Sequence, residues 1–143
     1  MKIAIASDHG GFDLKQKLIA YFANKNMPFE DLGTHSAESV DYPDFAKKMS
    51  LHILQKKADL GILICGTGIG VSIGANRFKG IRAALVYSPV VADLAKRHNN
   101  ANILVFGGRT MAFEDVVSCI ETFLNATFEG GRHQRRIDKL DME

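Results

Sequence analysis

The sequence has few cysteines, almost no excess of charge and no long hydrophobic run. Only Cys65 and Cys119 occur among 143 residues, too few for a disulfide framework and typical of a reducing compartment. A net charge of +2 offers no general attraction to nucleic acid or to a membrane surface. No apolar stretch approaches the length of a membrane span, and the run around Ile3 and Ile5 is too short for a signal peptide. We therefore expect a cytoplasmic protein that binds neither nucleic acid nor membranes.

The chain also lacks internal repeats, low-complexity segments and linkers, so we expect one domain over residues 1–143, ending in a basic segment at 130–143. Short apolar runs predict five strands, at residues 2–7, 28–33, 60–65, 81–86 and 102–107. Stretches of helical period follow them, at residues 11–24, 43–57, 71–77, 89–97 and about 113–124, with a short last helix in the basic segment. Alternating strands and helices predict a single-domain three-layer α/β/α sandwich with a five-stranded parallel sheet, Rossmann-like in architecture.

Polar residues and glycines gather where the predicted strands end. In such sheets ligands bind at the carboxyl ends of the strands. Three clusters directly follow strands, and a fourth follows the helix that begins near residue 89. They are Ser7-Asp8-His9-Gly10-Gly11, Cys65-Gly66-Thr67-Gly68-Ile69-Gly70, Gly107-Gly108-Arg109 and His98-Asn99-Asn100. We expect at least three of the four to share one rim of the sheet.

The loop CGTGIG, residues 65–70, places three glycines in five positions between a buried strand and a helix. Glycines there let several backbone N–H groups point at an anion or an oxyanion. The spacing is not the dinucleotide fingerprint, and the lysine of a P-loop is missing. A cysteine phosphatase would need arginine where Val71 stands. The loop is typical of an oxyanion cradle with Cys65 at its lip.

Each candidate residue also has a purely structural interpretation. Cys65 could be a small buried residue ending a core strand, although a helix N-terminus close behind it favours a thiolate. His98 could be a satisfied histidine at a helix end, and Asn99 a C-terminal cap. Asp8 and His9 could be a helix N-cap and its turn. From these residues alone the alternatives stay open.

Longer segments resemble the ribose-5-phosphate isomerase B family. They are, in the family's order, SDHGG, DYPDFA, GILICGTGIGVSIGANRFKGIRAALV, AKRHNNANILVFGGR and FEGGRHQRRI. They cover the chain almost from end to end, and the combination of CGTGIG, RHNNAN and EGGRHQRR is highly specific. The related galactose-6-phosphate isomerase subunits share the fold and much of the glycine loop but lack the GGRHxxR ending. This sequence therefore favours the ribose branch.

The resemblance implies an aldose–ketose isomerase that interconverts ribose 5-phosphate and ribulose 5-phosphate through an enediolate. Cys65 would be the carbon base, in a family where other members use glutamate at a different loop position. His98 would open the furanose ring, and Asp8 would bind or deprotonate a sugar hydroxyl. The remaining roles fall to Thr67 as a proton relay, to Gly66, Gly68, Ile69 and Gly70 as holders of the enediolate, and to Asn99 as an orienter of substrate oxygens.

The family also implies a phosphate clamp of Arg132 and Arg136, supported by His9 and Arg109. Arginines four apart on a helix project from one face, as a bidentate clamp requires. The alternative is a solvated basic tail. The resemblance further implies a homodimer, or a dimer of dimers, in which phosphate-binding residues reach across from the partner.

No cofactor and no metal are expected, because the histidines and acids show no ligand spacing. Two other functions remain open. One is isomerisation of a hexose 6-phosphate such as allose or galactose phosphate, which pocket depth would decide. The other is a non-catalytic sugar-phosphate-binding regulator, which would not need both Cys65 and His98.

Overall fold

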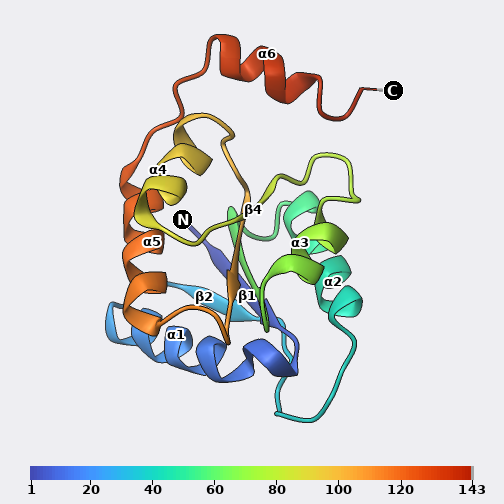
Figure 1. Ribbon diagram of the computed structural model, residues 1–143, viewed down its shortest axis with the longest axis vertical. Coiled ribbons are helices and arrows are strands. Elements are labelled where there is room, and N and C mark those ends of the chain that lie inside the picture. The colour runs from blue at the N-terminus through green and yellow to red at the C-terminus, as the bar shows by residue number, and fades with distance from the viewer. Residues whose placement is uncertain (143) are drawn as a thin grey trace.

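A parallel sheet with helices on both faces forms the body of the protein (Figure 1). The computed structural model describes residues 1–142. The sheet has five strands in the order β2-β1-β3-β5-β4, which confirms the predicted fold class. The strands are β1 (Ile3–Ser7), β2 (Phe29–Asp31), β3 (Leu60–Cys65), β4 (Ala83–Leu85) and β5 (Ile103–Gly107).

The helices begin and end close to the predicted positions. They are η1 (His9–Gly11), α1 (Phe12–Asn24), α2 (Tyr42–Leu54), α3 (Ile69–Ala75), α4 (Pro89–Arg97), α5 (Phe113–Asn125) and α6 (Arg132–Asp138). The Ser88 hydroxyl accepts the Val91 N–H, with Pro89 at the first helical position. α3 starts earlier than predicted, with Gly68 as its N-cap and the Gly68 carbonyl accepting the Ser72 N–H at 3.1 Å.

The central strand β3 is buried along its whole length. Alternate side chains point to opposite faces, so Ile62 and Ile64 pack with α1, α4 and α5, whereas Leu63 and Cys65 pack with α2 and α3. Each fully buried Ile or Leu side chain contributes about 1.5–3 kcal/mol to folding. The Cys65 side chain therefore faces the α2–α3 layer, next to the start of α3.

Because the strands are parallel, all their carboxyl ends lie at one end of the sheet and all their amino ends lie at the other. β1, β3 and β5 are neighbours, so the loops after their carboxyl ends meet at one rim. α4 runs back between two parallel strands, so its last residues lie at the amino ends of β4 and β5. In Figure 1, α6 lies at the top of the view beyond α4, and α1 lies at the bottom. Among the described residues, no helix has the length and apolar character needed to cross a membrane.

Candidate active site

Cys65 is buried at the end of β3, and its sulfur accepts a hydrogen bond from the Gly68 N–H at 3.1 Å. Gly68 has a φ of +81°, and a Cβ there would lie 2.6 Å from Cδ1 of Leu85 and 3.1 Å from the Phe106 carbonyl carbon. Only glycine can therefore turn the loop so that this N–H faces the sulfur. An N–H donor aimed at sulfur stabilises negative charge on it. The arrangement places a backbone hydrogen-bond donor against the Cys65 sulfur at the rim of the sheet.

Backbone hydrogen bonds join the three loops at this rim. The Gly108 N–H donates to the Cys65 carbonyl at 2.8 Å, and the Arg109 N–H donates to the Gly66 carbonyl at 2.9 Å. The Asp8 N–H donates to the Ile64 carbonyl at 3.2 Å. The expectation that at least three strand-end clusters share one rim is confirmed for β1, β3 and β5.

Asp8 and His9 are held by short backbone contacts at the same rim. Asp8 is buried, and its Oδ1 accepts the Gly11 N–H at 3.1 Å. Asp8 is thus the N-cap of η1, as its structural interpretation predicts. His9 Nδ1 accepts the Val40 N–H at 3.2 Å, so the hydrogen of the neutral ring is on Nε2. Around them Thr67, Ile69 and Arg109 are exposed, and Gly66 and Gly70 are half-buried. This cluster, with Cys65 and Gly68, is called the thiol half below.

His98 and Asn99 lie elsewhere, in what is called the basic half. With His133 and Arg136 they line a cavity of about 230 Å³, completed by Ile137 and Leu140. Arg132 is one turn before Arg136 on α6, and both arginines are exposed.

The two halves lie at opposite ends of the sheet. The Arg82 side chain, just before β4, donates to the Asn99 and Asn100 carbonyls, which places this turn at the amino ends of the strands. Gly61 pairs with Ile103 and Cys65 pairs with Gly107. These two pairs lie four residues apart along the strands, a distance of about 13 Å at roughly 3.3 Å per residue. One chain therefore does not bring His98 to Cys65.

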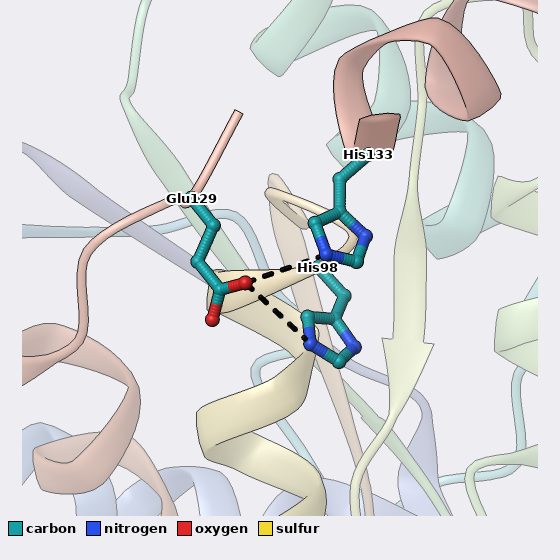
Figure 2. Close-up of side chains that lie close together, drawn as sticks. All are labelled: His98, Glu129 and His133. Carbon is teal, nitrogen blue, oxygen red and sulfur yellow. Dashed lines mark ion pairs between the residues drawn. The ribbon is translucent and has the colours of Figure 1, made fainter. Parts of the chain in front are cut away.

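Two residues of the basic half, Glu129 and His133, were not among the predicted site residues, although both lie in EGGRHQRR. The His98 and His133 rings stack with centroids 4.1 Å apart and planes 11° apart. Figure 2 shows Glu129 facing both rings, with Oε1 3.4 Å from His133 Nε2 and 3.9 Å from His98 Nε2. Burial lowers the pKa of His133, and nearby His98 and Arg132 lower it further.

The geometry of this cluster is poor for a metal ion, although one donor atom from each of the three side chains lies within 4.8 Å of the others. A metal binds in the plane of an imidazole ring, and two nearly parallel stacked rings cannot both direct Nε2 at one ion. Arg97 Nη1 also lies 3.5 Å from the Glu129 carboxylate, and Arg136 lines the neighbouring cavity. Arg97 is paired with Asp93 as well as with Glu129, which leaves Arg136 as the guanidinium that lines the cavity. The absence of a metal stays a prediction.

Comparison with known proteins identifies the family. A family model described as ribose/galactose isomerase matches residues 3–140. The chain belongs to the ribose/galactose isomerase family. The isomerase is 42% identical to ribose-5-phosphate isomerase B of Escherichia coli over 139 residues, 97% of this chain and 93% of that protein.

Two solved structures have the same fold. The isomerase is 57% identical to a ribose 5-phosphate isomerase from Thermotoga maritima, with a TM-score of 0.96 over 98% of this chain and 97% of the other. It is 45% identical to ribose-5-phosphate isomerase B from Mycoplasma genitalium with bound ribulose-5-phosphate, with a TM-score of 0.92 over 97% and 93%. The isomerase is thus an enzyme that interconverts aldose and ketose forms of a sugar phosphate.

Proposed function

We propose that the isomerase interconverts ribose 5-phosphate and ribulose 5-phosphate, with Cys65 as the carbon base. The observation that carries this proposal is the Gly68 N–H aimed at the Cys65 sulfur at 3.1 Å. The thiolate takes the proton from C2 of the open-chain aldose, and the glycine-loop N–H groups hold the resulting enediolate. Thr67 moves a proton from O2 to O1. The Cys65 thiol then returns its proton to C1, which leaves the ketose.

The remaining steps require the basic half. His98 opens the ring, with Asp8 on a sugar hydroxyl, and Asn99 orients the substrate oxygens. Arg132 and Arg136 bind the phosphate, supported by His9 and Arg109. Only five carbons connect the reacting aldehyde to the phosphate, so one substrate cannot extend between the two halves of one chain. We propose that each site combines the thiol half of one chain with the basic half of a second.

Exposed apolar side chains beside the glycine loop support a homodimer. Ile69, Ile73, Tyr87 and Val90 are 54%, 53%, 69% and 70% exposed. Ile69 and Tyr87 line one cavity together with Thr67, so this apolar surface adjoins the thiol half. Exposed large apolar groups that gather in one place mark contact surfaces. A second copy of the chain would cover them, and a dimer of dimers is the larger alternative.

Parallel assays test the substrate. The initial rates of wild-type enzyme and Cys65→Ala are compared on ribose 5-phosphate, allose 6-phosphate and galactose 6-phosphate. We expect the highest kcat/KM on ribose 5-phosphate, its loss in Cys65→Ala with binding within about threefold, and unchanged activity after exhaustive chelation. A higher kcat/KM on a hexose phosphate would favour the hexose alternative. Binding without turnover of any of the three would favour the regulator.

A further inference from the structure

Glu129 lies in the segment between α5 and α6, and its backbone fixes its position. The Glu129 N–H donates to the Arg97 carbonyl at 3.0 Å, which anchors the residue to the end of α4 whatever its side chain does. The carboxylate then faces two histidines that come from different elements, His98 after α4 and His133 in α6 (Figure 2). A change of side chain at this position can therefore leave the local backbone in place.

Glu129 is the carboxylate within 4 Å of both Nε2 atoms in the part of the chain that the structure describes. His133 Nε2 is buried without a hydrogen-bond partner, and its side chain is only 7% exposed. Its closest carboxylate oxygen is Glu129 Oε1 at 3.4 Å, and the same oxygen is 3.9 Å from His98 Nε2. Both distances exceed a hydrogen bond by about 0.5–1 Å, a gap that catalytic contacts commonly close when substrate binds.

The position of the Glu129 carboxylate affects both the tautomer of His98 and the charge that His98 can carry. A carboxylate in front of Nε2 favours the imidazole tautomer with hydrogen on Nε2, which leaves Nδ1 of His98 as the acceptor. The carboxylate also stabilises the positive charge that His98 acquires when it accepts a proton. Arg97 lies 3.5 Å from the other oxygen, Oε2, and keeps the carboxylate oriented while it faces the rings. His133 packs flat against His98 and restricts its rotation.

We propose that Glu129 is a positioning residue for ring opening, a role that rests on the function proposed for His98. Nδ1 of His98 takes the proton from the 1-hydroxyl of the furanose, the C1–O4 bond breaks, and the C1=O bond forms. O4 leaves with the bonding electron pair and receives the same proton back from His98. Glu129 touches neither the substrate nor the reacting atoms. It holds His98 in the tautomer that can carry this proton.

A pair of substrates isolates the ring-opening step. Ribose 5-phosphate is mostly cyclic, whereas 4-deoxyribose 5-phosphate has no 4-hydroxyl with which to close a furanose ring. General acid–base groups contribute roughly 10²–10⁴-fold, and a residue that orients one contributes part of that. We expect Glu129→Gln to lower kcat on ribose 5-phosphate by about tenfold to a hundredfold, with KM within about twofold. Its kcat on the deoxy substrate should match wild type.

Asp93→Asn is the matched control. It removes the other carboxylate that pairs with Arg97, whose Nε lies 2.9 Å from Asp93 Oδ2, and it leaves both histidines their neighbours. It should keep wild-type kcat on both substrates. Equal losses on the two substrates in Glu129→Gln would mean a general structural role and would overturn the proposal.

A double variant tests whether Glu129 acts through His98. If it does, Glu129→Gln should cost nothing further in a His98→Asn background, because the group that it orients is already gone. A further loss of tenfold or more there would overturn the proposal. Failure of the proposed function has a different signature. Cys65→Ala with full activity removes Cys65 as the carbon base and leaves ring opening untouched, and equal losses on the two substrates in His98→Asn remove His98 from ring opening and the Glu129 proposal with it. Equal losses in Glu129→Gln, with a selective loss on ribose 5-phosphate in His98→Asn, remove the Glu129 proposal alone.

Discussion

The surroundings of single residues distinguish the two cysteine sulfurs of this chain. Cys65 and Cys119 are both buried, but among residues 1–142 only Cys65 has a backbone N–H directed at its sulfur. Cys119 lies within α5, where burial and the nearby Asp115 raise its pKa and keep it a thiol. The two cysteines therefore differ in environment, since the proposed carbon base lies at the sheet rim and Cys119 lies in the core.

Alkylation should distinguish the two cysteines. Iodoacetamide should modify Cys65 faster than Cys119, and residual activity should fall in step with Cys65 modification, because a thiolate is the reactive form. Saturating substrate should slow both processes. The Cys119→Ala variant should be inactivated like wild type. Mass spectrometry of the labelled peptides measures the sites. Loss of activity with Cys65 unmodified would contradict the assignment.

The arginines of α6 should act mainly on substrate binding. A charge-assisted hydrogen bond is worth about 1.5–3 kcal/mol, so Arg132→Ala and Arg136→Ala should each lower kcat/KM by about tenfold to a hundredfold. Most of the loss should appear in KM, because the phosphate is remote from the reacting carbons. Arg135→Ala, also exposed on α6, is the control and should stay near wild type. Losses confined to kcat would contradict a phosphate clamp.

At the scale of elements, one buried ion pair joins α1 to β2. Lys15 has no exposed side-chain surface, and its Nζ lies 2.7 and 2.8 Å from the two oxygens of Asp31. Asp31 also accepts the Gly33 N–H at 2.9 Å, so the same carboxylate holds the loop that follows β2. A buried lysine without its carboxylate would leave an uncompensated charge in the interior.

Asp31→Asn should therefore destabilise the fold. Breaking a buried pair costs about 3–5 kcal/mol, and because a quarter of the Asp31 side chain is exposed to solvent we expect about 2–3 kcal/mol here. Asp13→Asn, at an exposed position in the first turn of α1, should change stability by less than about 0.5 kcal/mol. Urea unfolding at neutral pH measures both. Equal free energies of unfolding for Asp31→Asn and wild type would contradict this prediction and would show that water solvates the charge of Lys15.

The docking of α6 should depend on pH, because His133 is one of the two residues that the helix buries. The pKa of His133 is lowered from 6.5 by burial, His98, Arg132 and Arg136, against the opposing charge of Glu129. The folded state thus resists protonation. The stability that neutral His133 contributes should be complete above a pH of about 6.5 and should fall as the solution is acidified below that value.

Hydrogen exchange tests this dependence. Amide protection across residues 130–140, corrected for the intrinsic exchange rate, should be lower at about pH 5.5 than at about pH 7.5. Protection of β3 should not change over this range. A His133→Gln variant cannot be protonated at this position and should lose most of the dependence. Protection of α6 that rises on acidification would contradict the assignment.

In the molecule as a whole, the thiol half and the basic half of one chain lie at opposite ends of the sheet. Two copies related by a two-fold axis can bring each half of one chain against the other half of its partner, which creates two sites. The apolar surface around Ile69 and Tyr87 adjoins the thiol half, where such a partner would dock.

Mixed dimers test this arrangement. Cys65→Ala carries a damaged thiol half and His98→Asn a damaged basic half, so each hybrid dimer should hold one intact site. Subunit exchange between the two inactive variants should restore about a quarter of wild-type activity at random mixing. His98→Asn mixed with Arg136→Ala should show no more activity than the mean of the two unmixed variants, because both changes damage the basic half and no hybrid site is intact. No recovery in the first mixture, with hybrids shown to form by mass spectrometry, would contradict shared sites.

The strands and helices of this protein could be predicted from local sequence patterns. Strands such as β3 are continuous apolar runs, helices show a period of 3.6 residues, and both patterns depend on neighbours a few residues apart. The place of Gly68 in the loop between a strand and a helix could also be predicted, because a glycine-rich turn at such a place has few functions.

The sequence also determined that β1, β3 and β5 end in polar loops. Which residues those loops contact could not be predicted, because it depends on how the elements pack in three dimensions. Parallel strands force α4 to run backwards, which carries His98 away from Cys65 and to the opposite end of the sheet. The partnership of His98 with Glu129 and His133 depends on packing between residues more than thirty positions apart along the chain, and no local period encodes such a contact.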